Sequence, residues 1–255
     1  MTVSLTDLYD VIIGEIKAQQ EDKARLGMAA LMWVSHSEHP LNVDEICHAL
    51  AVEIGSAGIK TDNVPSIWPM LYCCQGLVTV GEESSTIQLI HFTLKEYLCD
   101  NAHLFSRAHS KMAETCLTCL NFQTIKSFNA RNFPITRGML PFLEYSSSYW
   151  GIHMRIELSD RPRSLALDFL RGYHNHISAK YLEESTFDRF FYSPMLPSAI
   201  HCVSYLGISQ VVIDLIRDKV WDVNQRDGAG LTLLMWAARY GRDEVVKVLL
   251  QHRHI

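Results

Sequence analysis

The feature that most constrains the fold of this 255-residue chain is an internal repeat near its C-terminal end. Residues Ser198–Gly207 align with Thr232–Gly241 after a shift of 34 positions. The apolar positions that follow align at the same shift, Val211-Val212 and Leu215-Ile216 with Val245-Val246 and Leu249-Leu250. A period of this length, built from two short helices, is typical of a solenoid whose units bury their apolar faces only against neighbours. The sequence therefore predicts stacked helix pairs over residues 193–255.

A turn motif precedes the first helix of the second copy. Glycine in such a turn adopts positive φ without steric cost, and a threonine hydroxyl at a helix start accepts a hydrogen bond from the first turn. The motif is formed by Asp222, Asn224, Asp227, Gly230 and Thr232. It closely resembles the ankyrin repeat, in which Ala237 and Ala238 would allow close helix packing and Gly241 would end the first helix in the left-handed conformation.

One position departs from the ankyrin pattern. Met235 stands where the family usually has a histidine, whereas His201 keeps that histidine in the first copy. Methionine makes none of the histidine's hydrogen bonds, so we expect the second repeat to be held by fewer hydrogen bonds than the first. Because an ankyrin unit does not bury its apolar face alone, we expect the first copy to lean on preceding helices. The second copy should be under-buried, fray first and self-associate through part of its stripe, Val245, Val246, Leu249 and Leu250.

The ankyrin resemblance also implies where a protein partner binds. In ankyrin repeats the turn tip and the inner helix face carry the variable contacts, and Tyr and Arg are frequent at binding hot spots. The predicted partner-binding residues are Arg226, Gly228, Ala229, Leu231, Arg239 and Tyr240, with Tyr205 and Leu206 one repeat earlier. An ordinary solvated face is the alternative, because composition alone does not define an interface.

The N-terminal part predicts helices followed by a hairpin. Residues 4–20 have the periodicity of an amphipathic helix. Its apolar face is formed by Leu5, Leu8, Ile12 and Ile16, with Tyr9 and Ile13 beside them. Residues 22–36 are apolar nearly all round, which predicts a central helix. Asn42 and Glu45 have the spacing of a capping box at the start of a third helix.

A short fourth helix over residues 64–75 precedes two predicted strands, at 77–80 and 86–90. Thr93 has the position of a second cap, at the helix after the hairpin. This order of elements is that of a winged helix. The chain is thus predicted to be mainly α, with a helical arm at 1–21, a winged-helix domain with a small β-hairpin at 22–105, a helical connector at 106–192 and about two repeats of a truncated ankyrin solenoid at 193–255. The clearest element of the connector is a helix over Ser164–Leu182.

The sequence contains no motif for catalysis or metal binding. It has no Gly-x-x-x-x-Gly-Lys-Ser/Thr loop, no Gly-x-Ser-x-Gly elbow and no His-Glu-x-x-His pair. Cys116 and Cys119 form a CxxC without the second pair of ligands that zinc requires, which favours two small buried residues on one helix face. His174 and His176 lie on different faces of a helix and are interpreted as part of a polar surface. We therefore expect no enzymatic activity and no cofactor.

Charge argues against nucleic-acid binding. The net charge is −5, from 23 basic and 28 acidic residues. Between Leu41 and Ile90 the only Lys or Arg is Lys60, and the candidate recognition helix at 64–75 has no charge, although groove binding needs phosphate contacts. A transcription factor is therefore the least favoured class.

The composition does not indicate a membrane protein or a secreted one either. The longest uncharged stretch, Phe190–Ile213, contains two prolines, a histidine and several other polar residues, so it does not resemble a membrane span. The first residues lack the basic and apolar regions of a secretory signal. Seven cysteines, an odd number, are most simply free thiols in a reducing compartment. We expect a cytoplasmic protein without membrane contact.

Residues 5–120 resemble the region after the ATPase core of fungal NACHT proteins of the NOD-like receptor (STAND) kind. There a helical arm leads into a winged helix named after GPI-inositol deacylase, and ankyrin repeats commonly follow. The matching segments are Ala30–Trp33, Pro40–Leu41, Glu45–Val52, Cys74–Val78, Leu89–Leu98 and Phe105–His109, with Tyr149, Trp150 and His153 further on. In such ATPases a histidine near the position of His91 contacts bound ADP. Because no phosphate loop is present, a partly buried histidine hydrogen-bonded to backbone is favoured here, and a sensor role requires an ATPase core upstream.

These observations predict a non-catalytic module for protein–protein interaction and signal coupling. The resemblance leaves one alternative open, the back half of a nucleotide-regulated ATPase whose phosphate loop lies outside this chain.

Overall fold

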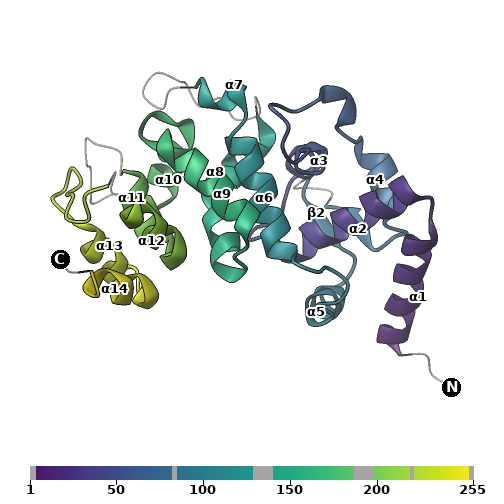
Figure 1. The fold of residues 1–255 in the computed structure, drawn as a ribbon. Helices are drawn as coiled ribbons and strands as arrows, with labels where there is room; N and C mark the ends of the chain where they lie inside the picture. Colours follow the sequence, from purple (N-terminus) through teal and green to yellow (C-terminus); the bar gives the residue numbers. More distant parts are fainter. Residues whose placement is uncertain (1–3, 82–84, 129–139, 187–197, 219–220, 253–255) are drawn as a thin grey trace. The chain divides into compact units, whose positions relative to one another are not determined.

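The computed structural model describes residues 4–81, 85–128, 140–186, 198–218 and 221–252 (Figure 1). The chain divides into two compact units. The first is formed by Met1–Glu53 and Ile59–Ala108, and the second by Ile54–Gly58 and His109–Ile255. The described elements are helices and a two-stranded antiparallel hairpin, which confirms the predicted fold class.

The first unit has the predicted order of helices and hairpin. Its elements are α1 (Leu5–Ala18), α2 (Glu21–His36), α3 (Val43–Ala51), the short 3-10 helix η1 (Thr61–Asn63), α4 (Ile67–Cys73), β1 (Val78–Val80), β2 (Ile87–Leu89) and α5 (Phe92–Asp100). In the hairpin Val78 pairs with Leu89 and Val80 with Ile87. The helix predicted at 64–75 is thus shorter, with Ser66 as its N-cap.

Helix α2 is the centre of this unit, as its all-round apolar sequence predicts. It packs against α1, α3, α4, α5 and β2. Ala30 and Leu31 are fully buried, and Trp33 nearly so. A Cβ atom at Gly27 would lie 2.6 Å from the backbone oxygen of Cys73, so the absence of a side chain lets α4 approach α2 closely.

The apolar face predicted for α1 is confirmed for Ile16, Tyr9 and Ile13 but not for Leu5 and Leu8. Its buried face is formed by Tyr9, Ile13 and Ile16. Leu5 and Leu8 stay 47% and 45% exposed. This helix carries two overlapping apolar stripes, one that includes Leu5 and Leu8 and one that includes Tyr9 and Ile13. The buried stripe is the one with Tyr9, whose hydroxyl group has a hydrogen-bond partner. The hydroxyl of Tyr9 lies 2.9 Å from Thr93 Oγ1, at the start of α5.

Of the two predicted caps, one is confirmed and one was wrong. Asn42 Oδ1 accepts from the Glu45 amide, and Glu45 Oε2 accepts from the Asn42 amide, each at 2.9 Å. At α5, however, the N-cap is His91 and not Thr93. Thr93 lies inside the first turn, where its amide donates to His91 Nδ1 at 3.3 Å. An imidazole nitrogen can thus replace the hydroxyl that the sequence pattern favoured.

The second unit contains the connector and the repeats. Its helices are α6 (Ala108–Leu120, whose first residue belongs to the first unit), α7 (Gln123–Lys126), α8 (Pro141–Ile156), α9 (Asp160–Arg171), the 3-10 helix η2 (Tyr173–Asn175), α10 (Ile177–Thr186), α11 (Ala199–Leu206), α12 (Ser209–Arg217), α13 (Leu233–Arg239) and α14 (Asp243–Leu250). The pair α11–α12 recurs as α13–α14 at the predicted shift of 34 residues.

The single helix predicted over Ser164–Leu182 was wrong. Helix α9 ends at Arg171 with Gly172 as its C-cap, η2 follows, and α10 begins at Ile177. His176 lies at the junction and is 3% exposed, so the polar surface predicted for His174 and His176 holds only for His174. The Nε2 atom of His176 bonds the Leu120 carbonyl at 3.0 Å, and burial lowers the pKa of His176 to about 4.

The repeats stack on the connector in two rows of helices. In one row α11 packs between α8 and α13, and in the other α12 packs between α9 and α14. Figure 1 shows α11 and α13 side by side in the green and yellow part of the chain. The helix pair α8–α9 therefore takes the place of a preceding repeat, and the prediction that the first copy leans on the connector is confirmed.

No helix in the described part of the chain is both long and apolar enough to span a membrane.

Candidate protein-binding surfaces

The turn before α13 is organised by one carboxylate. Asp227 Oδ1 accepts from the amides of Ala229 and Leu231 at 2.9 and 2.8 Å. Its second oxygen accepts from Trp236 Nε1 at 2.8 Å, which ties the turn to α13. Gly230 has φ +80°, so the positive φ expected there is confirmed. The backbone of the turn is thus fixed by Asp227, which also connects it to α13.

His201 joins the two repeats. It is fully buried in α11, its Nδ1 lies 2.8 Å from Ser198 Oγ, and its Nε2 lies 3.2 and 3.3 Å from the carbonyls of Gln225 and Leu231. Burial lowers the pKa of this imidazole, so it acts as a neutral link. The equivalent Met235 is 48% exposed. The histidine of one copy therefore reaches the turn of the next.

The other framework residues of the repeat hold most of their predicted roles. Thr232 caps α13 by accepting from the Met235 amide at 3.4 Å, and Gly241 has φ +61°. The Asn224 amide donates to Asp222 Oδ1 at 2.9 Å, which closes the preceding turn. Ala237 is buried, as helix packing requires, but Ala238 is exposed, so its predicted packing role was wrong.

An aromatic cluster lies beside this turn. The rings of Tyr205 and Tyr240 meet edge to face with centroids 4.7 Å apart, and Trp236 lies 6.2 and 5.7 Å from them. Trp236 is buried, whereas the two tyrosines are partly exposed. Arg239 places its guanidinium 5.9 Å from the Tyr240 ring centroid. Such rigid aromatic and arginine side chains have the composition of binding hot spots.

The structure places the predicted partner-binding residues in two groups, one in the turn before α13 and one at the ends of α11 and α13. Arg226, Gly228, Ala229 and Arg239 are exposed, and Leu231, Tyr205 and Tyr240 are partly buried. Leu206 was predicted wrongly, because it is only 3% exposed and faces α8. A Cβ atom at Gly151 in α8 would lie 2.5 Å from Leu206 Cδ1. We call the other seven residues the repeat surface.

Two arginines beside the repeat surface were missed from the sequence. Arg242 Nε donates to the Tyr205 carbonyl at 2.6 Å, and Arg155 Nη1 donates to the Leu206 carbonyl at 3.3 Å. Arg242 directly follows the glycine that ends α13, so the repeat pattern offered a signal for it. Arg155 lies in α8, some fifty residues away in sequence, and no local pattern predicts that approach.

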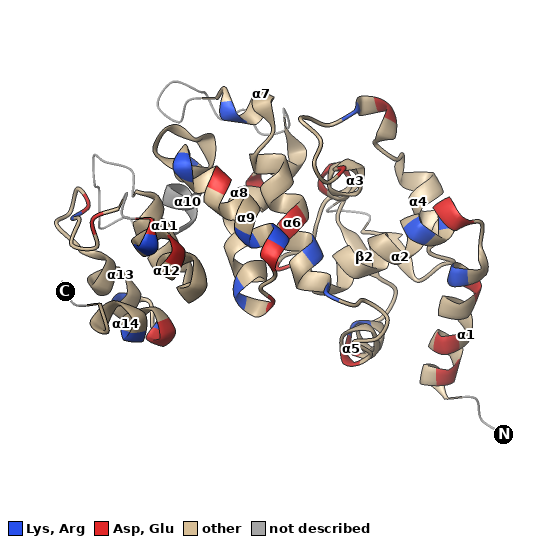
Figure 2. Cartoon of the chain, viewed as in Figure 1, with Lys and Arg blue, Asp and Glu red and all other residues tan. Residues whose placement is uncertain are grey.

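A second surface lies on the first unit, along α4. Trp68 and Tyr72 are 76% and 69% exposed and line an apolar groove of about 810 Å³ beside the start of α2. Lys23 places its ammonium group 5.8 Å from the Tyr72 ring centroid. Helix α4 itself is uncharged along its length (Figure 2). Its exposed aromatic side chains suit contacts with another protein, and it has no Lys or Arg to contact phosphate. The absence of DNA binding stays a prediction.

His91, the candidate nucleotide sensor, is exposed on the same unit. Its Nδ1 lies 2.7 Å from Thr93 Oγ1 and also accepts from the Thr93 amide. The backbone hydrogen bond agrees with the favoured interpretation, but the partial burial expected with it was wrong. It lines a hollow of about 360 Å³ with residues of α2, the loop after α2, β2 and α5, among them Ser37, His39 and Lys95.

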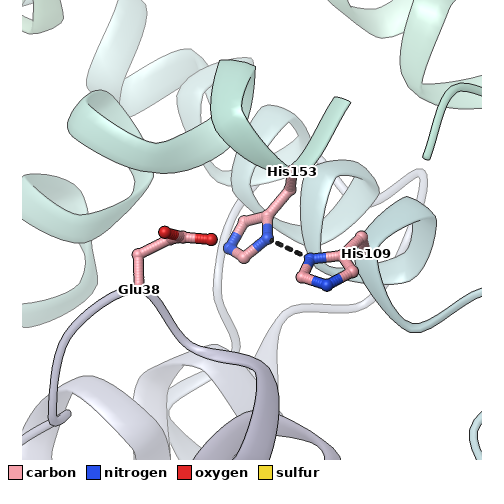
Figure 3. A group of neighbouring side chains, drawn as sticks. All are labelled: Glu38, His109 and His153. Atoms are coloured by element: carbon pink, nitrogen blue, oxygen red, sulfur yellow. Dashed lines mark hydrogen bonds between the residues drawn. The ribbon is translucent and has the colours of Figure 1, made fainter. Parts of the chain in front are cut away.

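A pair of histidines joins α6 to α8 in the second unit. His153 is fully buried, its Nδ1 lies 2.8 Å from His109 Nδ1, and its Nε2 lies 2.8 Å from the Tyr145 hydroxyl. Figure 3 shows the two imidazoles and the hydrogen bond that joins them. One Nδ1 atom must donate and the other accept, so the pair links α6 to α8 through a shared proton.

The CxxC motif lies inside α6. Cys116 and Cys119 are buried free thiols, and burial raises the pKa of Cys119 to about 12 and that of Cys116 well above its ordinary value. Such thiols are poor nucleophiles, which fits the interpretation as small core residues.

Two segments of the chain match known families. Residues 15–113 match the family of the GPI inositol-deacylase winged helix domain. Residues 229–255 match the ankyrin repeat. Searches of curated proteins and of solved structures found no match. The chain thus contains a winged helix domain of the GPI inositol-deacylase type and an ankyrin repeat, and ankyrin repeats in general support protein–protein interaction.

Proposed function

We propose that this chain is a non-catalytic protein–protein interaction and signal-coupling module that binds its partner through the repeat surface. The observation that carries the proposal is the rigid placement of Tyr205, Tyr240 and Arg239 beside a turn anchored by Asp227. A preorganised surface loses less entropy on binding than a mobile one. The order of winged helix and ankyrin repeat is similar to the part after the ATPase core of fungal NACHT–ankyrin proteins.

The coupling part of the proposal rests on the stacking of the repeats against α8 and α9. Arg163 in α9 donates to both oxygens of Asp214 in α12, each at 2.6 Å. A partner that shifts α13 therefore acts on α11 and then on the connector through packed side chains and a bidentate ion pair. The seven free cysteines support a reducing compartment such as the cytoplasm.

Capture of partners from cells tests the proposal. The tagged chain is used as bait, with a double variant, Arg239→Ala with Tyr240→Ala, and a control, Arg171→Ala, whose exposed side chain pairs with Asp168 one helical turn away. We expect a protein that wild type and control both retain and the double variant loses. Retention by all three baits would exclude the repeat surface.

Self-association is proposed through the apolar side chains of α13 and α14. Met235 and Leu250 are 48% and 63% exposed, whereas Val245 and Leu249 of the same stripe are buried. Sedimentation equilibrium should show a dimer that Leu250→Glu converts to monomer. A monomer at all concentrations would contradict this part of the proposal.

A nucleotide-regulated ATPase, of which this chain is the back half, is the second candidate. The exposed imidazole of His91, which lines a hollow together with Lys95, favours it. Calorimetric titration of the chain with ADP separates the candidates. We expect no appreciable binding, and micromolar affinity that His91→Ala abolishes would favour the ATPase.

A further inference from the structure

Two arginines converge on the C-terminal end of α11. Arg242 bonds the Tyr205 carbonyl at 2.6 Å and Arg155 bonds the Leu206 carbonyl at 3.3 Å. The last carbonyls of a helix have no partner within the helix, and cations are favoured beside them. The carbonyls of two consecutive residues thus hold two guanidinium groups at the same helix end.

Neither arginine has a carboxylate partner in the part of the chain that the structure describes. The ion pairs there join other residues, and no carboxylate oxygen lies within 4.0 Å of the guanidinium nitrogens of Arg155 or Arg242. Burial, and then the positive charge of Arg155, lowers the pKa of Arg242. A guanidinium has five N–H donors, and the carbonyl bond uses one in each arginine. The pair therefore offers donors and uncompensated positive charge together.

The surroundings hold Arg242 in this position. Its Cδ packs at Gly207, where a Cβ atom would lie 2.7 Å away, and Gly207 has φ +80°, which disfavours any side chain. Its guanidinium lies 5.8 Å from the centroid of the Tyr205 ring, whose edge-to-face partner is Tyr240. The group is thus oriented before a ligand arrives, and it lies next to the repeat surface.

We propose that Arg155, Arg242 and Tyr205 form a binding site for a carboxylate side chain on an acidic segment of the protein partner. A carboxylate takes two parallel N–H donors from a guanidinium, and the Tyr205 ring supplies a flat wall for the rest of the segment. An acidic peptide is favoured over nucleic acid because two arginines form a small site, while the chain as a whole has a net charge of −5. The inference rests on the proposed function and names the chemistry of the partner.

Binding of defined peptides tests the site. The probes are a fluorescein-labelled peptide of alternating Glu and Gly and its counterpart with Gln in place of Glu, measured by anisotropy with the full chain at low and at physiological salt. We expect the Glu peptide to bind at least tenfold more tightly, with salt-dependent affinity. Arg242→Gln and Arg155→Gln should each lower that affinity about tenfold or more, because each removes charged hydrogen bonds.

The control is Arg217→Gln, which makes the same change of net charge at the far end of α12 and should leave the affinity unchanged. Arg242→Lys keeps the charge but loses the planar fork, so its affinity should fall between those of wild type and Arg242→Gln. Arg155 is exposed, so its variant should fold even if Arg242→Gln does not. Equal binding of the two peptides, or unchanged affinity in both glutamine variants, would overturn the site. The proposed function would survive a failure of this site if the Arg239→Ala, Tyr240→Ala double variant still loses the captured partner.

Discussion

The ion pair between Arg163 and Asp214 should be a main tie between the connector and the first repeat. The side chain of Asp214 is 9% exposed and accepts two hydrogen bonds of 2.6 Å from Arg163, which is 30% exposed. Asp214→Asn keeps the shape but removes the charge and turns one acceptor into a donor that faces the guanidinium.

The magnitude follows from this geometry. Breaking a fully buried ion pair costs about 3–5 kcal/mol, but Arg163 keeps part of its hydration, which lowers the expected loss to about 2 kcal/mol. The matched control is Asp168→Asn, which breaks a pair of the same 2.6 Å length whose side chains are 69% and 53% exposed. That change should stay within about 0.5 kcal/mol.

Hydrogen exchange is the appropriate assay, because it reports on α12 separately from the rest of the chain. The Asp214→Asn variant should exchange its α12 amides about thirtyfold faster, and the Asp168→Asn variant should exchange them at the wild-type rate. Similar exchange of α12 in the two variants would refute the reasoning that burial, rather than pairing alone, sets the strength of this contact.

Three further predictions concern packing and titration. Since the pKa of His176 is lowered to about 4, the unfolded chain takes up a proton first as the pH falls from about 6.5, so unfolding free energy should drop by about 1.4 kcal/mol per pH unit toward pH 4. Urea unfolding of His176→Gln should show a slope smaller by up to about 1.4 kcal/mol per pH unit, since buried His201 still contributes, and an unchanged slope would contradict the prediction. Gly151→Ala should destabilise by about 1 kcal/mol in the same assay, because the clash with Leu206 exceeds the gain in helix propensity, whereas Gly14→Ala, with nothing within 4 Å, should be neutral or stabilising. Ellman's reagent should label Cys99 first, since the other six thiols are buried, and a fast phase that persists in Cys99→Ser would show otherwise.

Local patterns in the sequence predicted the elements whose causes are local. The repeat was visible because Gly207 and Gly241 end equivalent helices at the same spacing and both have positive φ. The capping box of Asn42 and Glu45 was visible because both partners lie within one turn. The helix break at Gly172 was missed, because apolar spacing continues across it and the following 3-10 helix keeps the same residues buried.

Contacts between distant segments decided the rest. The face that α1 buries depends on the meeting of Tyr9 with Thr93, which are 84 residues apart. Leu206 was assigned to the partner surface because its position in the repeat allows it, but α8 occupies that side through Gly151. Arg155 completes the proposed acidic-peptide site from another part of the connector. A single sequence does not encode these approaches in any local pattern.

The most direct test of the central claim is hydrogen exchange of the chain alone and in complex with its captured partner. Binding through the repeat surface predicts new protection at the amides of residues 226–231 and 233–240, with little change in α4. Protection confined to α4, around Trp68 and Tyr72, with none in the repeats, would contradict the account.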